Sequence, residues 1–149
     1  MKKLRLITNI VGAVLILAYL IALLALWEGL PNSIPTHFNA AGVPDRFGGK
    51  TSLLMEPILS VVLFAVFAAV ERFPNSWNLP VKITEENRER QYYIAAWTIS
   101  ILKVLTIGII LMGGLAGILI GFPMWVIIGF LFLLAGVAAA GIAVSIRNR

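Results

Sequence analysis

Four apolar stretches, each long enough to cross a lipid bilayer, constrain this chain more than any other feature of its sequence. A helix needs about 20 predominantly apolar residues to span the hydrocarbon core. We predict an all-α integral membrane protein: a four-transmembrane-helix bundle that forms a single domain over residues 1–149. The predicted spans cover roughly residues 6–27, 52–71, 94–120 and 124–146, joined by loops at 28–51 and 72–93.

The composition supports this class. Only 13% of the 149 residues are charged, against about 25% in soluble domains, and the mean hydropathy is +0.94. The formal charge is +5, but the basic residues flank the apolar runs, which favours contact with anionic lipid over nucleic acid. Cysteine is absent, which excludes disulfides, thiolate metal ligands and cysteine nucleophiles.

The first apolar run follows three basic residues, as in a secretory signal peptide. However, it is longer than the 7–15 apolar residues of a cleavable signal, and no small-residue cleavage site follows it. We therefore expect it to be retained as the first membrane helix.

The distribution of lysine and arginine predicts the orientation. If the chain has four spans, nine basic residues fall on one side of the membrane, and only Arg46 and Lys50 fall on the other. Because basic residues favour the cytoplasmic side, both termini are expected in the cytoplasm and loop 28–51 outside the cell. The nine are Lys2, Lys3, Arg5, Arg72, Lys82, Arg88, Arg90, Arg147 and Arg149.

Small residues spaced four apart are expected to let the helices approach closely. Gly113, Gly117 and Gly121 form two overlapping GxxxG steps, and we predict packing within the chain, with a homodimer through the same glycines as the alternative. Further small-residue steps are Ala18/Ala22, Ala65/Ala69 and Gly136/Ala140.

The connections carry local signals of their own. Residues 121–123, Gly-Phe-Pro, predict a tight turn that makes the last two spans an antiparallel hairpin. Thr84 is expected to cap a helix that starts at residue 85 and continues into the third span.

The outer loop contains the segment IPTHFNAAGVPDRFGGK, residues 34–50, which is polar and rich in turn-forming residues. Residues 34–38 and 43–47 are predicted to pair as short antiparallel strands around a turn at 39–42, because Asn and Gly tolerate positive φ. Thr51 or Ser52 is then expected to cap the second span. We expect a compact, hairpin-like extracellular cap over the mouth of the bundle.

The segment LPNSIPTHFNAAGVPDRFGGK resembles the signature "LP…IP.HFN..G.PD..G.K" of a bacterial membrane domain of unknown function, family 1648. That domain also forms the N-terminal part of SdpI-type immunity proteins, which protect cells from membrane-active peptide toxins. The segment FPNSWNLPVKITEENRERQYY is similar to a second motif of the stand-alone members. The resemblance implies a bacterial cytoplasmic membrane protein of the immunity or envelope-accessory type, whose partners are the bilayer and a peptide toxin or another membrane protein.

Six polar residues of the outer loop and the second span are candidates for ligand binding. We favour a non-enzymatic protein without a cofactor that binds a peptide or a lipid headgroup through the outer loop and the bundle mouth. The alternative is a membrane enzyme or metal-dependent protein in which His37, Asp45 and Glu56 converge. The six candidates are His37, Asn39, Asp45, Arg46, Lys50 and Glu56.

Three charged residues, Glu56, Glu71 and Lys103, lie inside the predicted spans, and two of them lead to specific expectations. Glu56 near the membrane edge is a candidate functional residue, and we expect it either to pair with Lys50 or Arg46 or to reach the headgroup layer. Lys103 in the third span is expected to extend its side chain to the cytoplasmic surface, because no acidic partner is evident at its depth.

Overall fold

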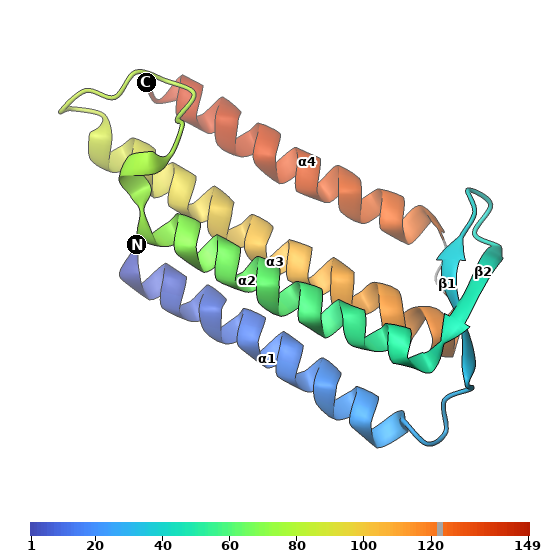
Figure 1. The fold of residues 1–149 in the computed structure, drawn as a ribbon. Coiled ribbons are helices and arrows are strands. Elements are labelled where there is room, and N and C mark those ends of the chain that lie inside the picture. The colour runs from blue at the N-terminus through green and yellow to red at the C-terminus, as the bar shows by residue number, and fades with distance from the viewer. Residues whose placement is uncertain (122–123) are drawn as a thin grey trace.

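The computed structural model describes residues 1–121 and 124–149 and confirms the four-helix membrane fold (Figure 1). All four helices are long and apolar enough to cross a membrane. The residues of the predicted turn that follow Gly121 lie outside the described part of the chain. The helices are α1 (Lys2–Leu26), α2 (Met55–Arg72), α3 (Arg88–Ile120) and α4 (Met124–Arg147).

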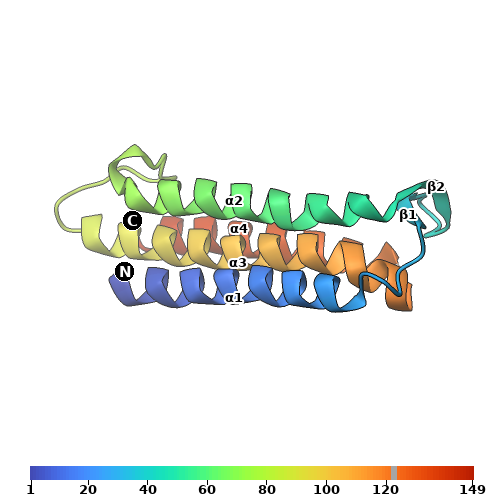
Figure 2. The same cartoon turned by 60° about the horizontal axis from the view of Figure 1, so that its bottom comes forward.

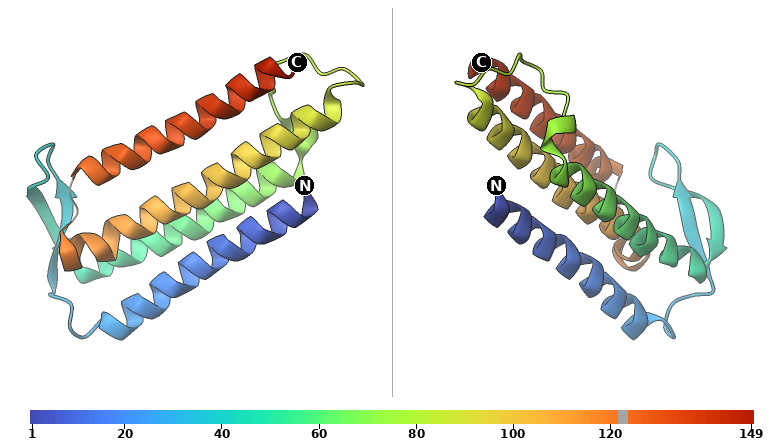
Figure 3. Two further views of the ribbon diagram at one scale, coloured as in Figure 1. Left: turned by 180° about the vertical axis from the view of Figure 1, so that it is seen from behind. Right: turned by 60° about the vertical axis from the view of Figure 1, so that its left-hand side comes forward.

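The helices run side by side along one axis and alternate in direction (Figure 2). The N-terminus, the C-terminus and the connection between α2 and α3 lie at one end of the molecule, and the strands β1 and β2 lie at the other (Figures 1 and 3). We call these the terminal end and the hairpin end. The arrangement agrees with four alternating spans.

Helix α3 is the centre of the fold, since it packs against each of the other three helices. The apolar core lies between α1, α2 and α3 and continues to the hairpin end through Leu30, Ile34 and Leu53. Helix α4 makes its main contacts with α3, and its most apolar window is unburied within the chain. Three helices and the hairpin therefore share one core, and α4 is attached to its side.

Close helix packing occurs at glycines other than those expected. A Cβ on Gly12 would lie 2.9 Å from the ring of Phe64, and one on Gly114 would lie 2.6 Å from Cδ of Glu56. By contrast, a Cβ on Gly113 or Gly136 would meet no atom within 4 Å among the described residues. The predicted close packing through these two glycines is therefore wrong, because no neighbouring helix, as far as the structure describes it, comes within contact distance of either one.

The predicted hairpin is confirmed. Strands β1 (Ser33–Phe38) and β2 (Pro44–Gly49) pair antiparallel, and Gly42 in the turn adopts φ +76°, a conformation that suits glycine. A short 3₁₀ helix, Lys50–Leu54, leads into α2. The expected cap by Thr51 or Ser52 is wrong, since neither the 3₁₀ helix nor α2 has a side-chain cap.

Helix α3 begins at Arg88, three residues later than expected. The Thr84 hydroxyl accepts from the backbone N–H of Asn87 at 3.3 Å, and the Asn87 side chain accepts from the backbone N–H of Thr84 at 2.9 Å. This reciprocal pair satisfies two amides just before the helix, as a capping box does.

Candidate functional site

Asn39 holds the turn of the hairpin. Its Oδ1 accepts hydrogen bonds from the backbone N–H groups of Ala41 at 2.9 Å and Val43 at 3.0 Å. The backbone of Asn39 also pairs with Val43 and Gly42. Among the candidate ligand-binding residues, Asn39 therefore has a clear structural role.

His37 and Asp45 lie on adjacent strands and form an ion pair or hydrogen bond, with 2.5 Å between Nδ1 and Oδ1. Both side chains are about half exposed, at 57% and 44%. Arg46 lies opposite His37 in the strand register and is also exposed. All three residues are exposed on the hairpin, outside the helical core.

Lys50 connects the hairpin to the end of α1. Its Nζ donates to the backbone oxygen of Trp27 at 3.0 Å and lies 5.0 Å from the centre of the Trp27 ring. A cation close to an aromatic face is stabilised by the ring quadrupole. Lys50 is therefore held at α1, away from the second helix.

A cavity of about 460 Å³ lies beneath the hairpin, between the start of α2 and the last third of α3. We call it the hairpin cavity. Its size is within the range of about 300–1,000 Å³ that is typical of small-molecule sites. Its lining residues are Ile34, Pro35, Thr36, Phe38, Gly48, Ser52, Leu53, Met55, Glu56, Gly113, Gly114, Gly117 and Ile118.

Glu56 is the one charged residue among these lining residues. The hydroxyl of Tyr19, from α1, lies 3.1 Å from Oε2 of Glu56 and 3.2 Å from the backbone oxygen of Leu53. The glycine at position 114 makes room for this carboxylate beside α3. The site therefore combines a partly buried acid, an adjacent phenol, and walls that carry both apolar side chains and the hydroxyls of Thr36 and Ser52.

The expected pairing of Glu56 with Lys50 or Arg46 is wrong. Within residues 1–121 and 124–149, the ion pairs are His37–Asp45 and Glu71–Lys103. Lys50 bonds to Trp27 instead, because α1 ends beside the start of the 3₁₀ helix.

The described residues contain no group of three His, Cys, Asp or Glu side chains arranged to hold a metal ion. The structure brings His37 to Asp45 on the hairpin and brings Glu56 to Tyr19 in the cavity. The convergence of His37, Asp45 and Glu56 that the enzyme alternative requires is therefore not formed.

A second polar cluster lies inside the helical core, nearer the terminal end. Nζ of Lys103 donates to both carboxylate oxygens of Glu71, at 2.9 and 2.8 Å, and to Oδ1 of Asn9 at 2.6 Å. The hydroxyl of Ser100 donates to Glu71 at 2.8 Å. The side chains of Lys103 and Glu71 are 0% and 2% exposed. We call these four residues the core ion cluster.

The expectation that Lys103 reaches the membrane surface is therefore wrong, and its acidic partner is Glu71. Lys103 lies 15 residues into α3, or roughly 22 Å along the helix, while Glu71 is next to the last residue of α2. The two side chains meet because the first turns of α3 extend beyond the end of α2 at the terminal end, so that Lys103 is level with Glu71. The sequence feature that could have identified this partner is the acidic residue Glu71, which ends the apolar run directly before Arg72.

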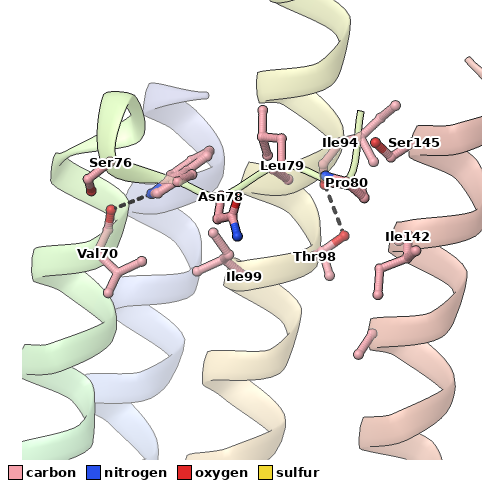
Figure 4. Close-up of a pocket in the computed structure, with 14 residues that line it drawn as sticks. Val70, Ser76, Asn78, Leu79, Pro80, Ile94, Thr98, Ile99, Ile142 and Ser145 are labelled. Atoms are coloured by element: carbon pink, nitrogen blue, oxygen red, sulfur yellow. Dashed lines mark hydrogen bonds between the residues drawn. The ribbon is translucent and has the colours of Figure 1, made fainter. Parts of the chain in front are cut away.

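A third feature is an apolar cavity of about 480 Å³ at the terminal end, between α3 and α4 (Figure 4). Residues 76–80 cross it, held by a hydrogen bond of 2.7 Å from Nε1 of Trp77 to the backbone oxygen of Val70. Thr98 lines it from α3, and its hydroxyl donates back to Ile94. None of the described residues that line it is charged, so it offers little to orient a polar ligand.

The helices, the hairpin and the cavity beneath it define a multi-pass membrane protein with a small structured cap. The family model described as "Domain of unknown function (DUF1648)" matches residues 14–61, which run from the middle of α1 through the hairpin into α2. An uncharacterized protein of Archaeoglobus fulgidus is 33% identical over 127 residues, covering 71% of this chain and 67% of the relative. The chain belongs to the DUF1648 family. No solved structure was found to match it.

Proposed function

We propose that this protein is a small membrane protein of the immunity or envelope-accessory type, which binds a peptide or a lipid headgroup through the outer loop and the bundle mouth. The observation that carries the proposal is the hairpin cavity, where Glu56 lies among apolar and hydroxyl-bearing residues beneath an ordered cap. Tyr19, the hairpin and Glu56 all fall within the residues matched by the family model. The similarity to the N-terminal part of SdpI-type proteins supports an immunity role.

Filling the cavity tests this function. Gly113 lines the cavity, and a side chain there has room at its Cβ, so Gly113→Leu is expected to block the ligand without disturbing the helices. The matched control is Gly108→Leu, because Gly108 has equal room on the same helix but does not line the cavity.

The purified chain and both variants are compared by native mass spectrometry after exposure to total polar lipids or to a synthetic cationic amphipathic peptide. We expect the wild type and Gly108→Leu to retain one of these ligands and Gly113→Leu to lose at least about 90% of it, a loss equivalent to about 1.4 kcal/mol. Equal retention by all three proteins would contradict a ligand site beneath the hairpin.

We also propose that the hairpin end faces the outside of a bacterial cytoplasmic membrane, with both termini in the cytoplasm. The bias of basic residues toward the terminal end supports this orientation. Single cysteines at Ala41, in the hairpin turn, and at Asn75, in the α2–α3 connection, are both at exposed positions. In intact cells, an impermeant maleimide should label Ala41→Cys and should leave Asn75→Cys unlabelled until the membrane is opened; the reverse pattern would refute the orientation.

A further inference from the structure

We infer that the hairpin cavity binds a primary ammonium group, of the kind carried by an ethanolamine lipid headgroup. This inference rests on the proposed function and specifies the ligand. It follows from the charge of the cavity, from the hydrogen-bonding groups on its walls and from its position at the end of the spanning helices.

The charge of the cavity is that of one carboxylate. Glu56 has no ion-pair partner in the part of the chain that the structure describes, and the single proton of the Tyr19 hydroxyl is shared between Glu56 and the backbone oxygen of Leu53. A carboxylate removed from water without a counter-charge is costly, and hydrogen bonds to a cation are among the strongest in proteins. A cationic ligand therefore gains most from this site.

The basic residue closest to Glu56 in sequence does not supply that charge. Lys50 is six positions before Glu56, but its ammonium is bonded to the backbone oxygen of Trp27 and faces the Trp27 ring. Arg46 lies in the exposed strand opposite His37 and is absent from the cavity lining. The arrangement leaves the acid available to a cation from outside the chain.

The walls favour a primary ammonium over a quaternary one. Besides Glu56, they present the hydroxyls of Thr36 and Ser52, which can accept N–H hydrogen bonds. Quaternary ammonium groups, which have no N–H, are recognised by cages of several aromatic rings. Phe38 is the one aromatic side chain among the described residues that line the cavity, so no such cage is formed.

The position of the cavity favours a lipid as the source of the ammonium group. The hairpin covers the cavity at the end of the helices, where lipid headgroups lie. The lining residues that are exposed, and so form the rim, include Met55 on α2, which is 63% exposed, and Gly113 on α3. Apolar rim residues on two spanning helices suit an acyl chain that leaves the headgroup in the cavity and remains in the bilayer.

Lipid exchange in detergent tests the inference with matched probes. The full chain is titrated with short-chain phosphatidylethanolamine, phosphatidylcholine and phosphatidylglycerol, and separately with a lysine-rich amphipathic peptide, and binding is followed by native mass spectrometry. The variants are Glu56→Gln, which preserves the shape of the side chain and removes its charge, and Glu28→Gln, a change of an exposed acid at the same end of the molecule. Gly113→Leu is included to block the cavity itself.

We expect phosphatidylethanolamine to bind at least about tenfold more tightly than the other two lipids, and Glu56→Gln to remove that preference, since a hydrogen bond to a charged group is lost. Glu28→Gln should leave the preference unchanged. Equal binding of all three lipids, or an unchanged preference in Glu56→Gln, would overturn the inference. If such a result accompanied lost binding in Gly113→Leu, the proposed function would stand without this ligand. Binding of the peptide alone, with dependence on Glu56, would overturn the lipid source.

Discussion

Replacement of Lys103 by methionine is expected to lower the free energy of unfolding by about 3–5 kcal/mol, the cost of leaving one partner of a buried ion pair uncompensated. Lys103 is fully buried and donates to Glu71 and Asn9. Methionine has a similar length and no charge, so the packing volume is largely kept. The carboxylate of Glu71 would remain in the helical core with Ser100 as its hydrogen-bond donor.

The measurement is reversible unfolding of the purified protein in mixed micelles, followed by circular dichroism. Lys3→Met, a change of an exposed lysine on α1, is the matched control and should shift stability by less than about 0.5 kcal/mol. The double variant Lys103→Met with Glu71→Leu should recover most of the loss, because replacing both partners by apolar groups is often neutral. A single variant as stable as the wild type would show that the core ion cluster does not stabilise the fold.

The helices and the hairpin could be predicted because their signals are local. Each helix follows from the length of one apolar run, which sets whether it can span a bilayer. The hairpin follows from a turn in which Asn39 can bond to its own backbone and Gly42 can adopt positive φ. Neither prediction depends on how the helices are placed relative to one another.

The partners of the charged residues could not be predicted, because each depends on the relative height of two helices. The contact between Lys103 and Glu71 requires α3 to start about 15 residues before the level of Glu71, and the sequence alone indicates no such offset. Likewise, Lys50 bonds to Trp27 only because α1 ends beside the 3₁₀ helix, and this contact leaves Glu56 without the partner that sequence proximity suggested. Spacing along the chain predicts contacts within one helix. Contacts between two helices also depend on how far one helix is shifted along its axis relative to the other.

The sequence likewise does not indicate which of the adjacent glycines, Gly113 or Gly114, packs tightly against neighbouring side chains. Gly114→Ala is expected to lower the free energy of unfolding by about 1–3 kcal/mol, the usual cost of overpacking a tight site. The new Cβ would lie 2.6 Å from Cδ of Glu56 and 2.8 Å from the hydroxyl of Tyr19. Glu56 can move into the hairpin cavity, but the Tyr19 ring is buried in the core and cannot move without disturbing it.

The neighbouring substitution Gly113→Ala is the control, because it adds the same methyl group to the same helix where no atom lies within 4 Å. It should raise stability by about 0.5–1 kcal/mol, the usual difference between alanine and glycine inside a helix. Thermal unfolding of both variants in the same micelles measures the difference. Equal stability of the two variants would show that Gly114 does not face Tyr19 and Glu56. The α3 wall of the hairpin cavity would then be misplaced, and both the proposed function and the ammonium site depend on that wall.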